Sequence, residues 1–473
     1  MSSGSEAEER VKLHLCALCR RQIAGEETPD VELVEKPFEC VLCFGLLDPA
    51  YIGEVAEAVA NQLKDSPYDA PACTLALNLP ISQTLRQTII KQARPDLNGI
   101  LVTVPYKIRN IDAYLPKLRE ASGLRLTLSS DLQLTIAFET DEFNDYDTKF
   151  LLEHFPENFQ QGRKRKFYEQ SQPQTTFTKI KVEQVLGRIK GDIARKYKLT
   201  CPSRPCSFTL ALERDPVFIA GRYCKYSRTL PQSPWSVEEK SAPKEPGNSV
   251  SEKVCDPMKN KFGASEARFI ASGREDMDVR MLGDGRPFAV ELRNCRFTNP
   301  LKGTDYEETL RNLEKEINKQ KDICVKYLTR VTREEAESLS VGEEEKRKHY
   351  VAYCYSTLPL SDDMLTNATK QAPIQVMQKT PIRVLKRRAL LDRPRTVYSM
   401  DILRVDSHHF LLRLVTQAGT YVKEFVHGDF GRTRPSMAEL LGVFEGEVDI
   451  LDLDVEKVEF DWPPMKTTPT SFR

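Results

Sequence analysis

Residues 271–292 read ASGREDMDVRMLGDGRPFAVEL, and this stretch decides how the C-terminal half of the chain is interpreted. Glycines, acids and arginines crowd together before an apolar run. Turn residues followed by an apolar run predict a strand–loop–strand whose loop presents a carboxylate. Arginines beside an aspartate lower its pKa and keep it ionised, as a nucleophile requires. The pattern does not separate Asp276 from Asp278, and a solvated charged loop remains the alternative.

Strands and helices alternate on the C-terminal side of this stretch without a strict βαβ rhythm. Alternating apolar residues predict strands at residues 323–327, 350–355, 395–404 and 409–417. A helix is expected to start at Thr304 or Asp305, and another at Thr332, because Thr332 and Glu335 have capping-box spacing. The sequence therefore predicts an α+β domain with a mixed or antiparallel sheet.

The N-terminal half shows its own periodicities and ends in a linker. A helix is expected over residues 51–66, a β-hairpin over 124–138, a basic helix over 182–193, and two strands at 208–212 and 217–223 joined by a tight turn. Residues 229–258 are rich in Pro, Ser, Glu and Lys and cannot bury a core, so we expect the main boundary there. The predicted organisation is an N-terminal module at 1–48, a domain at 50–228, the linker at 229–258 and a C-terminal domain at 259–473.

Composition sets limits on the class of protein. The chain has 473 residues, 40% hydrophobic and 29% charged, which suits two or three folded domains and excludes general disorder. No window approaches the roughly 18 apolar residues of a membrane span, and the acidic N-terminus predicts no secretory signal. Lys+Arg and Asp+Glu both total 69, so any nucleic acid must meet a local basic patch.

Two CxxC pairs stand near the N-terminus. Cys16 and Cys19 form the first pair, and Cys40 and Cys43 form the second. Two such knuckles complete a tetrahedron of thiolates around Zn²⁺, and four protein ligands leave no open position, so the predicted zinc site is structural. The alternative is four buried thiols. The other eight of the 12 cysteines show no paired pattern, which suits a reducing compartment.

Residues 416–432, TQAGTYVKEFVHGDFGR, form a third motif. Gly419 permits a close backbone approach, and Thr420 could cap a helix running from Tyr421. Lys423 then lies in the first turn of that helix, where a cation opposes the helix dipole and suggests an anionic partner nearby. The alternative is a surface lysine that reaches into solvent.

Charge is divided unevenly along the C-terminal half. Residues 379–434 hold 12 Lys/Arg against 5 Asp/Glu, whereas residues 439–461 hold nine acids and one lysine. The basic segment has the composition of a surface that binds a phosphate backbone, unless it is only a solvated face. Its candidate contacts are Arg383, Lys386, Arg387 and Arg388. The run at 163–166 resembles a nuclear localisation patch, or is a basic loop.

Three segments resemble the hallmark motifs of one family. ASGREDMDVRMLGDGRPFAVEL, QKTPIRVLKRR and TQAGTYVKEFVHGDFGR look like those of the Pus-ten family, the archaeal and eukaryotic tRNA pseudouridine synthases. GRYCKYSRTLPQSPW and DVEKVEFDWPP are similar to further family segments. The resemblance is strong over residues 208–464 and weaker over 50–200, where members carry a THUMP-containing RNA-binding domain.

The resemblance implies roles for individual residues. Asp276 would be the nucleophile, with Asp278 as the alternative, and Lys423 would pair with the catalytic aspartate. Tyr350 would stack on the target base, above the apolar Leu440. Arg274, beside the catalytic segment, is counted with the substrate-binding residues.

The resemblance also implies a fold and a reaction. The fold would be α+β, with a pseudouridine-synthase domain of mixed or antiparallel sheet after a zinc-knuckle and a THUMP-containing α/β domain. The substrate would be uridine 54, uridine 55 or both in the T-arm of tRNA, with structural Zn²⁺ and no organic cofactor. We expect a monomer in the nucleus or cytoplasm, with the mitochondrion as a further option; other structured RNAs remain open as substrates. The alternatives are a non-catalytic zinc-containing RNA-binding adaptor and an RNA methyltransferase, although the latter needs a Gly-rich cofactor loop that the sequence lacks.

Overall fold

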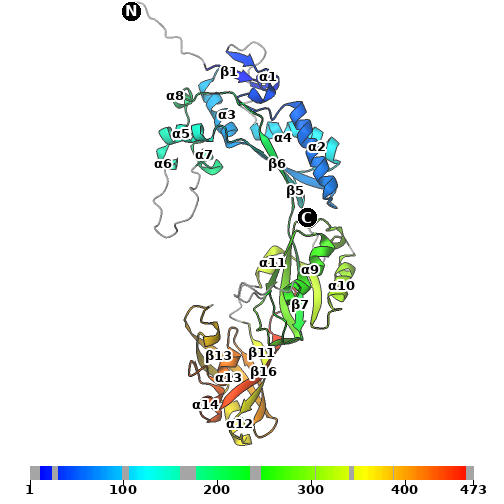
Figure 1. Cartoon of the computed structure of the whole chain (residues 1–473), viewed down its shortest axis with the longest axis vertical. Coiled ribbons are helices and arrows are strands. Elements are labelled where there is room, and N and C mark those ends of the chain that lie inside the picture. The colour runs from blue at the N-terminus through cyan, green and yellow to red at the C-terminus, as the bar shows by residue number, and fades with distance from the viewer. Residues whose placement is uncertain are drawn as a thin grey trace, which may run out of the picture. The chain divides into compact units, whose positions relative to one another are not determined.

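The computed structural model consists of two compact units, Met1–Arg214 and Asp215–Arg473 (Figure 1). It describes residues 11–23, 30–97, 106–159, 177–234, 247–303, 305–339, 346–386 and 388–464. The boundary precedes the predicted linker 229–258, which begins inside the second unit. The basic run at 163–166 lies outside the described residues. Among the described helices, none is both long and apolar enough to cross a membrane.

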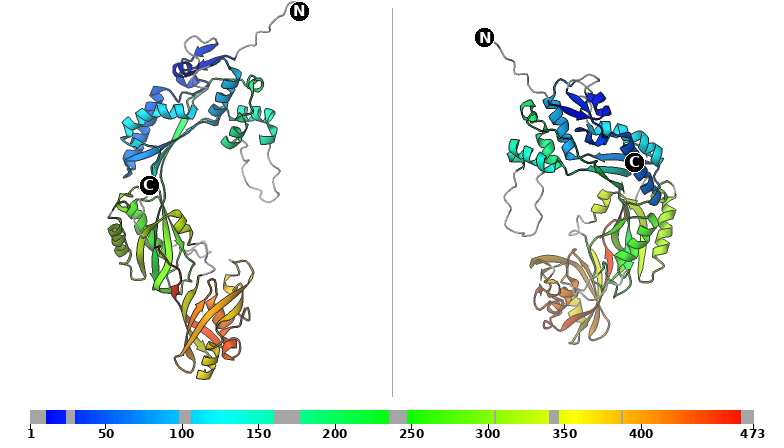
Figure 2. Two further views of the ribbon diagram at one scale, coloured as in Figure 1. Left: turned by 180° about the vertical axis from the view of Figure 1, so that it is seen from behind. Right: turned by 45° about the horizontal axis from the view of Figure 1, so that its top comes forward.

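The first unit combines a small parallel pair of strands with a larger sheet covered by helices. Its elements are β1 (Leu13–Leu15), α1 (Ala17–Ile23), β2 (Val31–Leu33), η1 (Pro37–Glu39), α2 (Pro49–Asp65), β3 (Ala72–Asn78), α3 (Ile81–Ala93), α4 (Tyr106–Ser122), β4 (Arg125–Leu126), β5 (Leu132–Glu139), α5 (Asn144–His154), α6 (Pro156–Phe159), α7 (Lys179–Leu186), α8 (Gly191–Ala194) and β6 (Ser207–Arg214). Helices α2 and α4 lie side by side against the sheet, as Figure 2 shows in blue and cyan.

The predicted hairpin over 124–138 is wrong in its pairing. The four-stranded sheet has the order β4-β3-β5-β6, so β3 lies between the two strands that the pattern joined. Both β4 and β5 pair with β3 in parallel. The alternation of apolar residues identifies strands, but it does not identify their neighbours, and here an earlier strand inserts between them.

The second unit is built around one large sheet. Its elements are β7 (Val217–Lys225), α9 (Val250–Phe262), β8 (Glu266–Ala271), β9 (Arg280–Arg293), η3 (Asn299–Leu301), α10 (Tyr306–Ile317), β10 (Ile323–Val331), α11 (Arg333–Glu337), β11 (Lys348–Ser356), α12 (Asp362–Thr369), β12 (Ile374–Lys379), η4 (Ile382–Val384), β13 (Asp392–Arg404), β14 (His409–Thr416), α13 (Val422–His427), β15 (Thr433–Arg434), α14 (Met437–Leu441) and β16 (Val448–Val458). The ten-stranded sheet runs β10-β7-β9-β16-β11-β14-β13-β12-β15, with β8 paired to β9.

This sheet is mixed, as the α+β prediction expects. Its pairs are antiparallel except β16 with β9, which is parallel. Helices α9 and α10 pack on it through buried apolar residues such as Val254, Met258 and Leu313. The predicted strands at 217–223, 323–327, 350–355, 395–404 and 409–417 are all present.

The strands at 208–212 and 217–223 enter different sheets. β6 pairs with β5 in the first unit, whereas β7 pairs with β9 and β10 in the second. The tight turn between them therefore coincides with the boundary between the units, at Arg214 and Asp215. Residues 229–258 have a polar composition, and for this reason the sequence predicted the boundary between the units later in the chain.

Candidate active site

A cavity of about 660 Å³ lies in the second unit where three loops meet the sheet. Its walls come from the β8–β9 loop (residues 272–279), the segment 383–395, the turn before α13 and strands β11 and β16. Eight of its lining residues are cationic and two are acidic. The lining cations are Arg274, Arg286, Lys348, Arg383, Arg388, Arg393, Arg395 and Lys423. Such a lining favours a polyanionic ligand.

Asp276 is an acid of this cavity with two cations on one oxygen. Its Oδ2 lies 2.9 Å from Nη1 of Arg383 and 3.5 Å from Nζ of Lys423. The two cations fix the direction of the carboxylate. The structure therefore brings Asp276 and Lys423 together, as the family resemblance implies.

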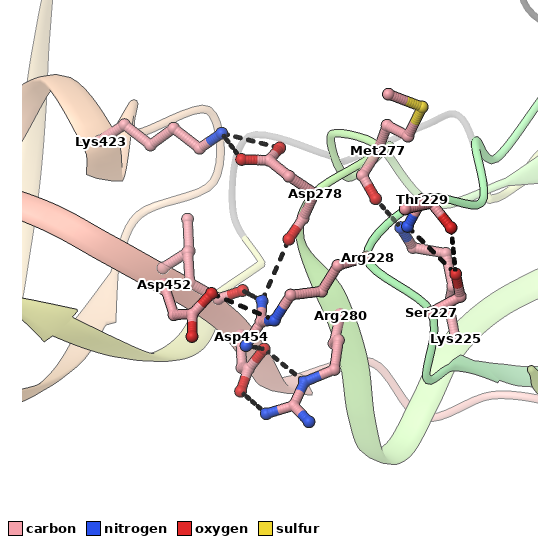
Figure 3. A network of polar contacts seen from close by, with 11 residues as sticks. Lys225, Ser227, Arg228, Thr229, Met277, Asp278, Arg280, Lys423, Asp452 and Asp454 are labelled. Carbon is pink, nitrogen blue, oxygen red and sulfur yellow. Dashed lines mark hydrogen bonds and ion pairs between the residues drawn. The ribbon is translucent and has the colours of Figure 1, made fainter.

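Asp278 is the closer partner of Lys423. The lysine Nζ donates to both carboxylate oxygens of Asp278, at 2.6 and 2.9 Å (Figure 3). Although burial opposes it, hydrogen bonding from Lys423 holds the pKa of the Asp278 carboxyl below its usual value. Asp278 is not among the described residues that line the cavity. This difference in position favours Asp276 as the reacting group.

Tyr350 lies on the cavity wall, on strand β11. It is partly buried against the core of the unit. Burial raises the pKa of its hydroxyl to about 12, so the group is neutral and carries its proton at physiological pH. A neutral tyrosine can both stack on a base and exchange a proton with it.

A buried network behind the cavity holds the start of the β8–β9 loop. Glu275 accepts hydrogen bonds from the hydroxyl of Tyr223, at 2.9 Å, and from Nε of Arg286, at 2.7 Å. Arg286 also donates to the carbonyl of Ser272 at 2.9 Å. Both members of the ion pair are buried and hydrogen-bonded to each other, so the pair holds the start of the loop in place.

The predicted substrate-binding residues fall into four groups. Arg274, Arg383 and Arg388 line the cavity, and Lys386 is exposed outside its lining. Leu440 is buried in the core on α14 and is not among the described lining residues. Arg387 lies outside the described residues.

Sequence reasoning named neither Arg286 nor Lys348 of the lining as a site residue, and it also missed Arg393 and Arg395. The latter two stand two residues apart at the start of β13, so their side chains share one face of the strand. An ideal Cβ on Gly419, which has a φ of +80°, would lie 3.3 Å from the guanidinium of Arg395. The close approach predicted at Gly419 is thus made to a cation of the cavity. The spacing of the arginines was the signal that could have identified them.

Helix α13 begins one residue later than the predicted cap requires. Its N-cap residue is Tyr421, and the hydroxyl of Thr420 donates to the carbonyl of Gln417 at 2.7 Å instead of capping the helix. The Thr420 cap is therefore wrong. Lys423 nevertheless lies in the first turn, as expected.

The four cysteines of the CxxC pairs converge in the first unit. The sulfur atoms of Cys16, Cys19, Cys40 and Cys43 all lie within 4.8 Å of one another, so they could hold a metal ion. Sγ of Cys16 and Sγ of Cys43 are 3.6 Å apart. Hydrogen bonds from the neighbouring cysteines lower the pKa of the Cys16 thiol. Four thiols at this spacing match the donor set and geometry that a tetrahedral Zn²⁺ needs.

Helix α3 supports the second pair of cysteines. Nε2 of Gln83 donates to the carbonyl of Cys43 at 2.8 Å, and both groups are buried. Arg86 is also buried and lies over the rings of Phe143 and Phe44, at 3.8 and 5.1 Å from the ring centroids. The cysteine cluster is thereby fastened to the core of the unit rather than carried on a free loop.

Two family models cover most of the chain. The model described as eukaryotic Pus10, N-terminal, matches residues 40–213, and the model described as Pus10, C-terminal, matches residues 218–459. The chain is 35% identical over 436 residues to the tRNA pseudouridine synthase Pus10 of Xenopus laevis, covering 90% of this chain and 81% of that protein. It is 33% identical over 438 residues to the Homo sapiens protein of the same name, covering 90% and 79%. A solved Cbf5-Nop10-Gar1 complex matches at a TM-score of 0.27 and 16% identity, over 50% of this chain and 58% of that chain.

Proposed function

The chain belongs to the Pus10 family of tRNA pseudouridine synthases, and we propose that it isomerises uridine to pseudouridine in the T-arm of tRNA, at position 54, position 55 or both. One observation carries the proposal: the Asp276 carboxylate stands in a cationic cavity, held by Arg383 and Lys423. Tyr350 on the wall of the same cavity supplies a ring and a neutral hydroxyl.

The reaction is an isomerisation, so atoms and charge balance without a second substrate. The bond between N1 of uracil and C1′ of ribose breaks, the base turns, and a bond forms between C5 and C1′. C5 then loses its proton, and N1 gains one. Asp276 acts on the sugar, as a nucleophile or as a base, and Tyr350 relays the C5 proton while its ring holds the base.

The target uridine must leave its stack to reach Asp276. Flipping a base out costs a few kcal/mol, which contacts to the flanking phosphates offset. The arginines of the cavity, Arg274, Arg388, Arg393 and Arg395 among them, suit that task because a guanidinium binds phosphate oxygens in a bidentate fashion. The first unit would add RNA contacts through a THUMP-containing region within residues 50–228.

The test compares Asp276→Asn with Asp278→Asn on unmodified tRNA transcript. Chemical mapping of pseudouridine should show product at position 54 or 55 with wild type and none above background with Asp276→Asn. Asp278→Asn loses only the pairing with Lys423 and should keep most of the activity. The roles of the two aspartates are reversed if Asp278→Asn is the inactive variant, and the proposed function is wrong if wild type forms no pseudouridine in any tRNA.

The proposal includes a structural Zn²⁺ on Cys16, Cys19, Cys40 and Cys43. A metal bound by four thiolates cross-links the segments that carry the two pairs and contributes to folding rather than to the reaction. Leu440 is not among the described lining residues, so it would support the base indirectly, through the hydrophobic core that also packs against Tyr350. We also propose that the chain is a monomer, which sedimentation would test. We propose that it works in the nucleus or cytoplasm, which imaging of a tagged chain would test.

A further inference from the structure

Three successive backbone carbonyls of the β8–β9 loop accept hydrogen bonds from cations of a single segment at the end of β7. Nζ of Lys225 donates to the carbonyls of Asp276, at 3.2 Å, and Met277, at 2.7 Å. Nη1 of Arg228 donates to the carbonyl of Asp278 at 3.0 Å. Figure 3 shows the contacts with the carbonyls of Met277 and Asp278, on the side of the loop away from the Asp278 carboxylate.

The ammonium of Lys225 is buried and its hydrogen-bonding capacity is filled. The side chain has no exposed surface, and Nζ has a third acceptor in the carbonyl of Leu230 at 2.9 Å. Three acceptors match the three protons of a charged ammonium group. A charge is buried only where its environment compensates it, and here neutral carbonyls of the loop provide much of that compensation. Burial also lowers the pKa of Lys225.

Arg228 ties the same loop to the centre of the sheet. Its guanidinium donates to the carbonyl of Leu453 at 2.9 Å and pairs with Asp452 at 3.2 Å and Asp454 at 2.8 Å. Arg280 pairs with Asp454 from the other side, with Nε 2.9 Å from Oδ1. Each of the loop residues 276–278 thus has its backbone carbonyl held by a side chain of this segment. At residue 278 the side chain is Arg228, which also contacts β16.

We propose that Lys225 and Arg228 are positioning residues of the reaction: they fix the backbone of residues 276–278 so that the Asp276 carboxylate stands between Arg383 and Lys423. Neither residue is among the described lining of the cavity, so both act through the loop and not on the substrate. The inference rests on the proposed role of Asp276. An error of about 1 Å in the position of a reacting group lowers a rate by about a hundredfold. The hydrogen bonds from Lys225 and Arg228 to the carbonyls of residues 276–278, which we call the brace, therefore affect the rate although neither side chain contacts the RNA.

Arg222 provides a matched control on the same strand. It is also a buried cation that donates to backbone carbonyls, but these belong to residues 284–285 and to Val458, Phe460 and Trp462, outside the loop. Lys225→Met and Arg222→Met each remove a buried cation from β7. Both should lower the thermal stability of the second unit, so assays belong at a temperature where each variant is folded.

Two measurements test the proposal on the full chain. Hydrogen exchange of peptides covering 272–281 should quicken in Lys225→Met and not in Arg222→Met. With tRNA already bound, the single-turnover rate of Lys225→Met should fall by about tenfold to a hundredfold with the tRNA Kd little changed, whereas Arg222→Met should stay within about threefold of wild type. If Lys225→Met does not fold, Arg228→Gln replaces it, because Arg228 is partly exposed.

The results of these two measurements can be distinguished from the result that tests the proposed function. Unchanged exchange of residues 272–281 in Lys225→Met overturns the brace whether or not the protein makes pseudouridine. Quickened exchange with an unchanged single-turnover rate overturns the positioning role. Equal rate losses in Lys225→Met and Arg222→Met also overturn it, since they indicate a general loss of structure. Absence of pseudouridine with wild type counts against the proposed function, while the exchange measurement still decides on the brace.

Discussion

Arg383 and Lys423 are the nearest cations to different aspartates of the β8–β9 loop. Arg383 contacts Asp276 and also donates to Oε1 of Glu424 at 2.7 Å, while Lys423 is nearer to Asp278. Glu424 is buried on α13, so it holds the guanidinium from behind. Burial opposes the charge of Arg383, but the hydrogen bond with Glu424 and the nearby Asp276 keep the pKa of the guanidinium above its usual value. Arg383, predicted as a phosphate contact, thus also orients Asp276.

Arg383→Met should therefore slow the reaction and not only weaken binding. A charge-assisted hydrogen bond contributes about 1.5–3 kcal/mol, and partial exposure of both groups favours the lower end, so the single-turnover rate should fall by about tenfold. The matched control is Lys386→Met, which removes an exposed cation of the same segment outside the cavity lining. Rapid quench with saturating enzyme measures both. A normal rate for Arg383→Met with weakened tRNA binding would return Arg383 to the role of a phosphate contact alone.

Tyr350 should contribute through its proton as well as through its ring. With a pKa raised to about 12, the hydroxyl stays protonated across the range used for assays, so the rate should show no fall from its ionisation up to about pH 10. Tyr350→Phe keeps the ring and loses the proton relay, and the single-turnover rate should fall by about a hundredfold at unchanged tRNA affinity.

Tyr353→Phe is the control for that variant. Tyr353 lies on the same strand with its ring stacked on His409, outside the described lining of the cavity. It should leave the pH profile and the rate unchanged. Equal effects of the two substitutions would indicate a disturbance of β11 rather than a role for the Tyr350 hydroxyl.

At the scale of elements, the segment 380–391 between β12 and β13 carries two of the cations that line the cavity, Arg383 and Arg388. The segment is held in place by Arg432, whose Nη2 donates to the carbonyl of Thr380 at 2.7 Å, and by Asp429, whose Oδ2 accepts from the amide of Ile382 at 3.2 Å. Both of these hydrogen bonds are made near its start, and Lys386 and Arg388 are exposed to solvent. Such a segment can bind RNA without disturbing the core.

Alanine at Lys386, Arg387 and Arg388 together should weaken tRNA binding and flatten its salt dependence. Removing one phosphate contact reduces the slope of log K against log salt by roughly 0.7–0.9. Filter binding at three salt concentrations measures the slope, and the reaction of bound tRNA should change less than the affinity. The control replaces Lys315, Lys319 and Lys321, which are exposed in the last turn of α10 and in the segment that follows it. Parallel slopes for wild type and both triple variants would place the RNA path elsewhere on the chain.

The elements that could be predicted are those fixed by neighbouring residues. The capping box at Thr332 and Glu335 is confirmed in both of its hydrogen bonds, at 3.2 and 2.7 Å. The strands at 323–327, 350–355, 395–404 and 409–417 follow from alternation. What could not be predicted depends on partners far along the chain: the place of β3 between β4 and β5, and the contact of Arg383 with Asp276. The same distinction holds in the site, where motifs located the residue types but not which cation meets which carboxylate.

At the scale of the whole molecule, the two units have separate hydrophobic cores. The core of the first unit includes Cys40 and Cys43 beside Leu13 and Leu15, whereas that of the second is built on the ten-stranded sheet. Loss of the proposed metal should therefore act on the first unit alone. This separation makes the metal and the reaction independently measurable.

Cys43→Ser should abolish zinc binding and lower the Tm of the first unit while the second unfolds at its usual temperature. Thiolate ligation couples metal binding to folding, so the effect should resemble that of a strong chelator on wild type. The control is Cys73→Ser, which alters a buried thiol of the same unit outside the cluster and should keep one zinc per chain. Metal analysis with calorimetry measures both. Purified wild type that contains no zinc and has four freely titratable thiols would refute the metal site.

Strand β16 lies between β9 and β11, yet it follows every other strand of that sheet in the sequence. During synthesis on the ribosome, β9 and β11 therefore emerge long before the strand that joins them. Until β16 arrives, β11 presents an unpaired edge, whereas β9 lacks its β16 partners only at Arg280 and Met281. An unpaired edge such as that of β11 favours association with other chains. The carbonyls of Asp278 and Leu453 that Arg228 bridges also meet only at that point. The nascent protein should thus depend on chaperones late in translation, and the reaction centre should form in the last step of folding.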